Sequence, residues 1–397
     1  MPDPREVVVV GGGPAGAAIA VYLRQLGRDV LLLDEARFPR DKICGEAVSP
    51  EAWRLLEDIG AASSVAALGP WPLRGMRLTS PDGTAFEGRY LGAPRPGFAL
   101  RRRDLDHALL ARAYAAGVDV REGTRVGGLI LANGRVAGVL AESGRATEPI
   151  RARLTIGADG RRSVVARHLG LLTEHAWLRK FAVRGHWDGM AGLQDTGEMH
   201  VAGGGYCGVA PLAPAEANVA FVLDRREMRE AAGDLPAFYR RALGRWPRIL
   251  DRLGGARLVD APRAIGPLAL EARRLFAPGA LLVGDAAGFL DPFTGEGVTL
   301  ALRTAEIAAP YADAYVRTGN LEELRRYDRA RAAATRDKFR VNRILLRVVS
   351  CPGLANRVAR KLERRPELAD RLVGIAGDFV PARAALGPGF LLRLLLA

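Results

Sequence analysis

The chain is poor in cysteine and histidine, which limits the kinds of site that it can build. Its three cysteines, Cys44, Cys207 and Cys351, are too few and too widely spaced for a disulfide framework. The five histidines show no spacing typical of metal ligands, apart from the loose pair His186 and His200. We therefore expect no structural disulfide and no metal site.

Long apolar runs are also absent. No stretch approaches the ~20 apolar residues of a membrane span. The first apolar run, residues 7–10, leads straight into glycines, which is unlike a secretory signal, so we expect a cytoplasmic protein. The apolar C-terminal stretch 386–397 predicts either a helix packed on the body of the protein or a reversible peripheral contact with the inner membrane face.

Acidic residues are the scarcer charge, because 44 Asp and Glu stand against 58 Lys and Arg and leave a formal charge of +14. This excess indicates attraction to anionic lipid or an acidic substrate, or simply an arginine-rich proteome. Nucleic-acid binding is not expected, because the basic residues are spread along the chain without a recognition motif. With 397 residues, the chain can form one large or two medium globular domains.

The N-terminal third has the pattern of strand, glycine turn, helix and strand. Residues 7–10 and 30–33 are all apolar, as in parallel strands covered on both faces. Residues 14–26 have apolar side chains at helical spacing and end at Gly27. The same alternation returns later, with expected strands at 118–120, 154–156 and 281–283 and expected helices at 105–115 and 297–315.

Segments of a different character interrupt this pattern. Residues 74–90 predict a hairpin around Pro81-Asp82-Gly83, and residues 176–224 alternate in a way that predicts an antiparallel sheet. The end of the chain is helical and arginine-rich. We therefore predict an α/β fold with a Rossmann-like dinucleotide-binding domain (1–73, 98–175 and 263–335), an inserted antiparallel β-sheet substrate domain (74–97 and 176–262) and a helical C-terminal region (336–397).

The strongest motif is the glycine turn Gly11-Gly12-Gly13-Pro14-Ala15-Gly16, which lies between a strand and a helix. Such a turn lets backbone approach a pyrophosphate, and the helix N-terminus offers free N–H groups and the positive end of its dipole. Asp34, at the end of the second strand, is the carboxylate expected for a ribose hydroxyl, with Glu35 as the alternative on the opposite side of the strand. The pattern predicts a dinucleotide site without separating NAD from FAD.

Two later segments resemble motifs of the para-hydroxybenzoate hydroxylase-like flavoprotein superfamily. Residues 157–167 contain Asp159-Gly160 and resemble its central Asp-Gly motif, and residues 282–288 contain Gly284-Asp285 and resemble its Gly-Asp motif. The resemblance implies an FAD-binding domain, with Asp285 on the ribityl chain and residues 291–298 facing the isoalloxazine ring. The FAD contacts that we expect are Gly11, Gly13, Pro14, Ala15, Gly16, Asp34, Glu35, Lys42, Cys44, Gly45, Glu46, Arg102, Val126, Asp159, Gly160, Gly284, Asp285, Pro292, Gly295, Gly297 and Val298.

Residues 38–46, Phe-Pro-Arg-Asp-Lys-Ile-Cys-Gly-Glu, resemble the loop of the geranylgeranyl reductase family, in which a Cys-Gly-Glu tripeptide lies beside the flavin. That family includes bacterial oxidoreductases of quinone and natural-product pathways. Cys44 is then either a small buried hydrophobe or a catalytic group that modulates the flavin surroundings or donates a proton. A lowered thiol pKa would require a positive neighbour, for which Lys42 and Arg40 are the candidates in the sequence.

The motif that faces the substrate departs from that family. Its usual Tyr-x-Trp-x-Phe-Pro is reduced here to a retained Tyr206 and Pro211, with Gly208 in place of tryptophan and Ala210 in place of phenylalanine. The smaller residues widen the pocket beside the flavin and weaken the case for an isoprenoid. Tyr206 is the second catalytic candidate, as a substrate-positioning group or proton donor, and the alternative is a plain sheet aromatic. The Trp-x-Trp-x-Ile-Pro stretch of flavin-dependent halogenases is absent.

The resemblance implies an enzyme, an FAD-dependent oxidoreductase acting on a hydrophobic small molecule. The first hypothesis is reduction of a carbon–carbon double bond in an isoprenoid or quinone-like substrate. The alternative is an FAD-dependent monooxygenase that hydroxylates a phenolic or polyketide-like compound, with a halogenase or a non-catalytic flavoprotein behind both. NADPH or NADH is the expected electron donor and visits transiently, because the sequence shows no second glycine-rich nucleotide fold; another carrier is the alternative. The oligomeric state stays open.

Overall fold

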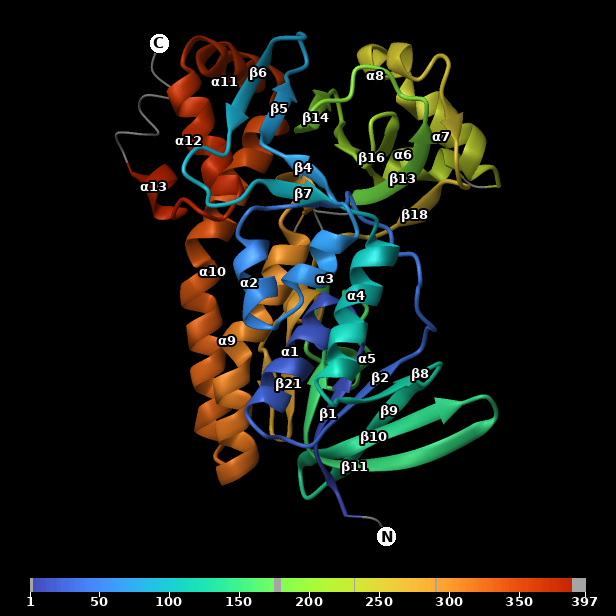
Figure 1. The fold of residues 1–397 in the computed structure, drawn as a ribbon, viewed down its shortest axis with the longest axis vertical. Coiled ribbons are helices and arrows are strands. Elements are labelled where there is room, and N and C mark those ends of the chain that lie inside the picture. The colour runs from blue at the N-terminus through green and yellow to red at the C-terminus, as the bar shows by residue number, and fades with distance from the viewer. Residues whose placement is uncertain (1–2, 175–179, 232, 290, 388–397) are drawn as a thin grey trace.

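The computed structural model describes residues 3–174, 180–231, 233–289 and 291–387. Figure 1 shows an elongated molecule with one large sheet in its lower half and another in its upper half. The long helices α9 (Gly297–Thr318) and α10 (Leu321–Val349) run side by side along one edge. The predicted α/β architecture, with several sheets and a helical C-terminal region, is thus confirmed.

The lower sheet has the strand order β20-β21-β11-β1-β2-β8. Strands β1 (Arg5–Val10) and β2 (Val30–Asp34) pair in parallel from Val7↔Val30 to Val10↔Leu33. Residues 7–10 and 30–34 are buried throughout, as their apolar sequences predict for strands covered on both faces. The other strands of this sheet are β8 (Asp119–Glu122), β11 (Ala146–Gly157), β20 (Phe276–Ala277) and β21 (Ala280–Leu282).

Helices α1 (Pro14–Gln25), α4 (Arg102–Ala115) and α9 accompany this sheet, and α1 contacts both of the others. The buried face of α1 is rich in alanine, and such short side chains allow the backbone of a neighbouring helix to come close. These helices and the parallel strands form the largest apolar core. The helices predicted at 14–26, 105–115 and 297–315 are confirmed, although α4 already begins at Arg102.

An antiparallel arm extends from the lower half of the molecule and was not predicted from the sequence (Figure 1). It consists of β9 (Arg125–Ala132), β10 (Arg135–Ser143) and the first half of β11. The second half of β11 joins the parallel sheet beside β1. Only that second half is continuously buried, which explains why the apolar run at 154–156 indicated a short strand.

The upper sheet has the order β17-β13-β16-β15-β14-β5-β6, with β18 also paired to β13. The predicted hairpin is present as β5 (Gly75–Thr79) and β6 (Ala85–Arg89). The expected antiparallel pairing is confirmed from β13 to β16, but β14 and β5 pair in parallel. These two strands come from separate chain segments, so no hairpin fixes their direction. The remaining strands are β13 (Lys180–Asp188), β14 (Thr196–Ala202), β15 (Gly205–Pro211), β16 (Glu216–Asp224), β17 (Arg257–Leu258) and β18 (Arg263–Ile265).

Two further cores stabilise the upper half. One lies between the upper sheet and helices α7 (Leu235–Leu243) and α8 (Pro247–Arg252), where Phe221 stacks on Tyr239 and Trp246. The other joins β6 to α11 (Pro352–Arg364) and α12 (Pro366–Ala376), and α13 (Arg383–Leu386) follows. Among the described residues, no helix combines the length and apolarity that crossing a membrane requires. The predicted role of the C-terminal tail falls largely on residues 388–397, which lie outside the described part.

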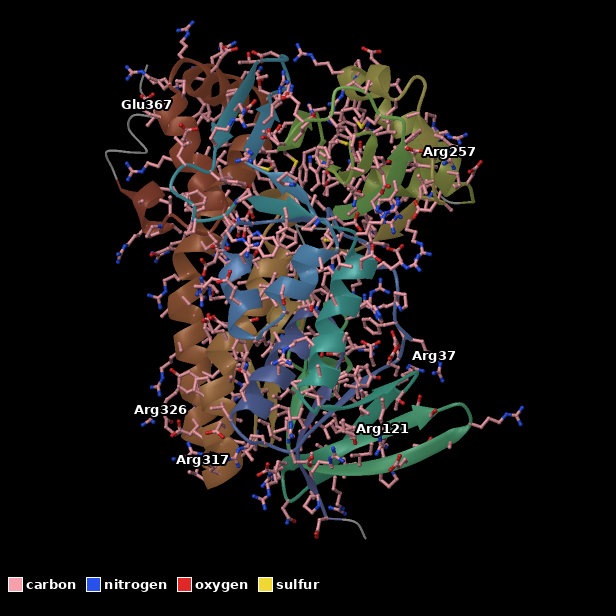
Figure 2. All side chains as sticks on the ribbon, in the orientation of Figure 1. Arg37, Arg121, Arg257, Arg317, Arg326 and Glu367 are labelled. Carbon is pink, nitrogen blue, oxygen red and sulfur yellow. The ribbon has the colours of Figure 1, made fainter. Side chains whose placement is uncertain are left out.

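Shorter helices and strands connect the lower and upper halves of the molecule. The domain boundaries predicted from the sequence stay a prediction. Labelled arginines such as Arg121, Arg257 and Arg326 project from widely separated elements, so the positive charge is spread over the surface (Figure 2). Two small sheets have the orders β12-β19-β22 and β3-β7-β4. The connecting elements are β3 (Ala47–Val48), α2 (Ala52–Asp58), α3 (Ala62–Ala67), β4 (Trp71–Leu73), β7 (Gly97–Ala99), α5 (Val164–His168), β12 (Leu172–Glu174), α6 (Arg225–Met228), η1 (Arg229–Ala231), β19 (Leu270–Ala272), η2 (Gly284–Ala287), β22 (Gly288–Phe289) and η3 (Pro292–Thr294).

Candidate active site

The glycine turn after β1 requires glycine at two positions, at Gly11 for its backbone conformation and at Gly16 for lack of space. Gly11 has φ +103°, and a Cβ there would lie 2.6 Å from the carbonyl oxygen of Ala158. A Cβ on Gly16 would lie 1.7 Å from the carbonyl oxygen of Gly11. Helix α1 then begins at Pro14, with no side chain capping it and no acidic residue in its first turn. Its first N–H groups are therefore open to an anion.

Asp34 closes this turn from the end of β2. Its Oδ2 accepts a hydrogen bond from the backbone N–H of Gly12 at 2.6 Å, and its Oδ1 accepts one from that of Ala36 at 2.8 Å. The side chain of Asp34 is buried at the turn, whereas Glu35 is exposed. Of the two carboxylates that the sequence offers for a ribose hydroxyl, Asp34 therefore lies beside the turn and Glu35 points to solvent. Val126 is buried in β9, which begins close to the end of β2.

The Asp159-Gly160 motif lies where β11 ends beside β1. The N–H of Ala158 donates to the carbonyl oxygen of Val10 at 2.8 Å, which holds the motif against the glycine turn. Asp159 Oδ2 accepts from the N–H of Val164 at 2.6 Å, and Oδ1 is buried without a hydrogen-bond partner. Burial raises the pKa of Asp159. A buried acceptor without a partner is costly, so this atom indicates a missing donor.

The Gly-Asp motif reaches the same place from the other end of the chain. Gly284 has φ +59°, and a Cβ there would lie 2.6 Å from the Cβ of Ala15 in the glycine turn. Its N–H donates to Thr304 Oγ1 of α9 at 2.9 Å. The glycine at position 284 therefore lets η2 pack directly on the start of α1, and it places Asp285 beside the turn.

Lys42 and Asp285 interact through their charges. Burial lowers the pKa of Lys42, Arg102 and Arg40 lower it further, and Asp285 opposes them. Burial raises the pKa of Asp285, against the effect of Lys42, Arg161 and Arg102. Within the described residues, neither of these two side chains has a hydrogen bond or a direct ion pair. The Nζ of Lys42 lies 3.6 Å from where a Cβ on Gly160 would be, so both groups are available to a polar ligand.

Cys44 lies beside a cation that the sequence did not indicate. Burial alone would lower the pKa of Arg102, but Asp106 and the sulfur of Cys44 raise it. Arg102 also makes two hydrogen bonds to Asp106, at 2.7 and 2.8 Å. The Sγ of Cys44 accepts from the N–H of Glu46 at 3.3 Å. The positive neighbour of the thiol is therefore Arg102, whereas the sequence offered Lys42 and Arg40.

Glu46 is the buried anchor of the Cys-Gly-Glu loop. It adopts φ 62°, and its side chain is 0% exposed. The carboxylate accepts hydrogen bonds from the N–H of Arg102 at 2.9 Å, from Asn218 Nδ2 at 2.9 Å and from His186 Nε2 at 2.7 Å. Asn218 Nδ2 also donates to the carbonyl oxygen of Cys44 at 2.7 Å. The upper sheet thus fixes the loop through two side chains, from β13 and β16.

The network continues from His186 to the surface. His186 Nδ1 lies 3.1 Å from Asp260 Oδ2, which also accepts from Arg184 Nη1 at 2.8 Å. Arg184, fully buried, also pairs with Asp41 of the loop. Burial and Arg184 oppose the charged form of His186, but the hydrogen bond and charge of Glu46 outweigh them, so the pKa of His186 is raised. Hydrogen bonds from Arg184 and His186 overcome partial burial and lower the pKa of Asp260 to about 2.

Tyr206 belongs to a separate network on β15. Its hydroxyl donates to Asp291 Oδ1 at 2.5 Å, and Asp291 also pairs with Lys180 at 3.5 Å and accepts from the N–H of Phe293 at 3.0 Å. Burial, reinforced by Asp291, raises the pKa of Tyr206 far above its usual range. Its ring contacts Phe293 edge-on. Tyr206 thus holds the loop that precedes α9, and its hydroxyl proton is used in the hydrogen bond to Asp291.

The same loop carries a buried ion network at the start of α9. Pro292 lies in η3, Gly295 has φ +70°, and Gly297 and Val298 open the helix. Lys338 of α10 pairs with Glu296 at 2.9 Å and with Asp378. Burial raises the pKa of Glu296 to about 8, although Lys338 opposes it. One lysine between two carboxylates is balanced when one of them is protonated, which agrees with a raised pKa at Glu296.

Several residues of these networks were missed in the sequence, namely Arg184, His186, Asn218, Asp260 and Lys338. Arg184 and His186 lie two positions apart in the buried middle of β13, so both point to the same face, which is the signal that could have revealed a buried polar pair. In the sequence, His186 and His200 form a loose pair with the spacing closest to that of metal ligands. Instead, His200 Nε2 bonds Glu198 at 2.8 Å, and the described residues contain no cluster able to hold a metal.

Taken together, these groups fit a dinucleotide. The open N-terminus of α1 fits a pyrophosphate, Asp34 fits a ribose hydroxyl, and the buried charges of Lys42 and Asp285 offer a donor and an acceptor to a polar chain. The orphaned Oδ1 of Asp159 calls for one more donor. The start of α9 adds the positive end of a helix dipole, which favours negative charge on a neighbouring ring.

Comparison with known proteins agrees with this geometry. The family model described as "FAD binding domain" matches residues 5–340. Menaquinone reductase of Mycolicibacterium smegmatis is 30% identical over 324 residues, which cover 77% of this chain and 75% of that protein. Digeranylgeranylglycerophospholipid reductase of Methanosarcina mazei is 30% identical over 337 residues, covering 81% and 78%. Conditioned medium factor receptor 1 of Dictyostelium discoideum is 29% identical, and the match spans 62% of its length.

Solved structures share the fold at lower identity. The flavin-dependent brominase Bmp2 superposes with a TM-score of 0.85 at 19% identity, covering 94% of each chain. A flavoprotein/dehydrogenase from Cytophaga hutchinsonii gives a TM-score of 0.85 at 20% identity, covering 98% of this chain and 96% of that one. At these identities the likeness establishes the fold alone.

Proposed function

Since the chain belongs to the FAD binding domain family and is an FAD-dependent oxidoreductase, we propose that it reduces a carbon–carbon double bond or a quinone ring of a hydrophobic isoprenoid or quinone-like substrate. The observation that supports this most is the similarity, at about 30% identity, to proteins named menaquinone reductase and digeranylgeranylglycerophospholipid reductase. The Cys-Gly-Glu loop points in the same direction.

We assign the cofactor contacts from the geometry of the site. The N–H groups that open α1 bind the pyrophosphate, Asp34 binds the ribose, Asp285 binds the ribityl chain, and the start of α9 faces the isoalloxazine ring. Lys42 lies close enough to Asp285 and Gly160 to act on the same part of the cofactor. When bound, FAD supplies hydride transfer.

The chain's own residues then orient the site and provide the proton. Glu46, through His186 and Asn218, ties the Cys-Gly-Glu loop to the upper sheet, and Tyr206 ties down the loop before α9. Cys44 is the proposed proton donor, because its thiol is half-buried beside the guanidinium of Arg102. The two acidic side chains of its loop are engaged elsewhere, Asp41 with Arg184 and Glu46 with His186 and Asn218. Tyr206 acts as a positioning residue, since its hydroxyl is bonded to Asp291.

A monooxygenase is the second candidate, and the strand β15 favours it. The aromatic side chains that the reductase motif would place at positions 208 and 210 are absent. Ala210 is instead packed among Leu73, Ala99 and the ring of Trp71. Without these aromatic side chains, β15 lacks the feature that would mark the reductase, which favours a phenolic substrate over a prenyl chain.

One experiment separates the two functions. The flavin-loaded enzyme is reduced anaerobically with NADPH and, separately, with NADH, because either is the proposed donor, and the flavin absorbance is then followed by stopped flow. Reoxidation by menaquinone or by geranylgeranyl lipids without oxygen supports the reductase. Reoxidation by oxygen alone, with hydroxylated product from a phenolic panel, replaces it with the monooxygenase.

We also propose a peripheral membrane contact through the C-terminal region. Helix α11 buries Ala355, Val358 and Leu362 and presents basic residues such as Arg357 and Arg364 outward. Such a helix is attracted to anionic headgroups. Co-sedimentation with phosphatidylglycerol vesicles should fall when residues 386–397 are deleted or when these arginines are replaced, and binding unchanged in both variants rejects the contact.

A further inference from the structure

Two small residues lie opposite each other in the middle of the upper sheet. Gly208 of β15 pairs with Ala220 of β16, and both strands are central in the strand order. Both residues are partly exposed, although Val219 and Phe221, which alternate with Ala220, are buried against α7 and α8. Gly208 and Ala220, here called the open pair, are therefore exposed on the face of the sheet turned away from those helices.

The open pair is bounded by buried residues, so it is not the exposed edge of a sheet. A sheet edge exposes residues along a whole strand, whereas the exposure here ends one position away on this face in every direction. The six surrounding residues are all buried: Tyr206 and Ala210 along β15, Asn218 and Val222 along β16, and Arg184 and Met199 on the adjacent strands β13 and β14.

Gly208 has room for a side chain that the other glycines of β13 to β15 lack. A Cβ on Gly185, Gly197 or Gly205 would lie 2.9, 2.6 or 2.3 Å from its nearest neighbouring atom, so a side chain there would clash. A Cβ on Gly208 would meet nothing closer than 3.6 Å, and its three nearest atoms all belong to residues of the sheet itself. Gly208 has no positive φ, so its backbone does not require a glycine. The space in front of position 208 is therefore open because the residue there is small.

The open pair differs from the two positions, 208 and 210, at which the sequence predicted a wider pocket. Ala210 is buried and packs with Leu73 and Ala99, so its neighbours close that position. Ala220 contributes instead, because it lies directly across from Gly208. The Cβ atoms of opposed residues are about 5 Å apart, so the open pair is wide enough for a group two side chains across.

Two hydrogen bonds place the open pair between loops of the candidate active site. Tyr206 precedes the β15 member of the pair by two positions and donates to Asp291 in the loop before α9. Asn218 precedes the β16 member by two positions and donates to the carbonyl oxygen of Cys44. Residues two positions apart in a strand are about 7 Å apart and share a face, and β15 and β16 run antiparallel. The open pair therefore lies between the Cys-Gly-Glu loop and the loop before α9, about 7 Å from the anchor of each.

The groups beside the open pair favour a ligand oxygen that accepts a hydrogen bond. The half-buried thiol of Cys44 lies beside the guanidinium of Arg102. The carboxylates of the two loops, Glu46 and Asp291, are already bonded to side chains of the upper sheet. A quinone carbonyl only accepts, whereas a phenol must also find an acceptor for its proton. A bare prenyl chain has no oxygen and is about one side chain wide.

We propose that the open pair is the ring subsite of the substrate, in which a flat quinone ring lies against Gly208 and Ala220 with one carbonyl oxygen directed to Cys44. The two small residues then select a ring over a bare prenyl chain, because a larger side chain at either position would occupy the place of ring atoms. This inference rests on the proposed function, since it takes the substrate to be quinone-like, and it adds which part of that substrate the sheet recognises.

The test measures ligand binding to the oxidised, FAD-loaded protein by equilibrium dialysis. Menadione, a naphthoquinone without a prenyl tail, reports on the ring, and geranylgeraniol reports on the chain. Gly208→Leu and Ala220→Leu should each weaken menadione binding at least about tenfold, because the leucine fills space that the ring needs. Both variants should bind geranylgeraniol within about threefold of the wild type.

Gly203→Leu is the matched control. Gly203 is exposed in the turn between β14 and β15, and nothing lies within 4 Å of where its Cβ would be. The control should leave both affinities unchanged. If Gly208→Leu does not fold, Gly208→Ala takes its place, because its Cβ meets only ordinary contacts, and it should weaken menadione binding about threefold.

FAD content separates a substrate site from the cofactor site. The flavin absorbance per protein should be the same in the wild type and in both leucine variants. Loss of FAD from either variant would place the cofactor, and not the substrate, against the open pair, and would overturn the proposal. Equal weakening of menadione and geranylgeraniol, unchanged menadione binding in both variants, or tighter binding of naphthol than of menadione by the wild type would overturn it as well.

Reoxidation of the reduced flavin by menadione without oxygen tests the proposed reaction separately. If menadione binds as expected but does not reoxidise the flavin, the ring subsite stands and the proposed reduction of quinones fails. If the wild type and both variants are reoxidised at the same rate, with the same half-saturating menadione concentration, the reduction stands and the ring subsite fails.

Discussion

The hydrogen bond between His186 and Glu46 makes a quantitative test of the site possible. His186→Gln keeps a neutral donor near Glu46 but removes the positive charge that the buried carboxylate now faces at 2.7 Å. A hydrogen bond to a charged group contributes about 1.5–3 kcal/mol, and a neutral one about 0.5–1.5 kcal/mol. The substitution should therefore lower the free energy of unfolding by about 1–2 kcal/mol at pH 6. Asp260 contributes little to this difference in free energy, because its side chain is 34% exposed and its charge is screened by solvent.

The pH dependence gives the sharper signature. The pKa of His186 is raised in the folded protein, so its stabilising effect is complete below the unfolded value near 6.5. This contribution is lost as the pH rises through the folded pKa, because the folded state then releases a proton that the unfolded state has already lost. During that loss the free energy of unfolding falls by at most about 1.4 kcal/mol per pH unit. The variant lacks this fall, so its disadvantage should shrink between pH 6 and pH 9.

Urea unfolding of the FAD-loaded wild type and variant, at half-unit steps from pH 6 to pH 9, measures this difference directly. His107→Gln is the matched control, because His107 is exposed on α4. The control should follow the wild type at every pH. Wild-type and His186→Gln curves that run parallel across the whole range would refute the charged pair between His186 and Glu46.

Three further substitutions test other parts of the site. Asp285→Ala should weaken FAD binding about 10- to 100-fold through loss of a charge-assisted hydrogen bond; a purified variant with full flavin absorbance contradicts the ribityl assignment. Burial raises the pKa of Glu296 to about 8, so between pH 6 and pH 8 the folded state holds a proton that the unfolded state has lost, and the free energy of unfolding falls as the pH rises. Glu296→Gln should flatten this fall. An unchanged pH dependence shows that the carboxylate facing Lys338 is already ionised. Cys44→Ala should retain FAD but lower kcat about 100-fold or more if the thiol donates the proton, and wild-type kcat returns Cys44 to a packing role.

The sequence predicted the structure correctly where the steric or hydrophobic requirement involves residues close together in the chain or in adjacent strands. The glycines at 11 and 16 are required by contacts with backbone that lies nearby in the chain or in the adjacent strand, and the apolar runs at 7–10 and 30–33 mark strands covered on both faces. The arm of β9 and β10 was missed because its residues alternate irregularly and include the pair Gly127 and Gly128. A weak pattern of this kind does not distinguish a strand from a loop.

Pairings between distant segments could not be read from the sequence. The parallel contact of β5 with β14 joins residues more than a hundred positions apart, and no hairpin announces it. For the same reason, the cation beside Cys44 was sought among its chain neighbours, whereas the structure supplies Arg102 from the start of α4. Burial and charge partners depend on which surfaces meet, and local propensity says little about that.

The sequence by itself determined the dinucleotide site and the α/β fold, because a glycine turn and all-apolar strands each express a short-range steric or hydrophobic requirement. FAD, as distinct from NAD, followed from the resemblance of the Asp-Gly and Gly-Asp motifs to a flavoprotein superfamily. Only the tertiary structure decided how the charges are arranged. It joined Glu46 to His186 across 140 positions of the chain and joined Tyr206 to Asp291. Electrostatic interactions act through space between side chains that folding alone brings together, so their partners appear only when the fold is known.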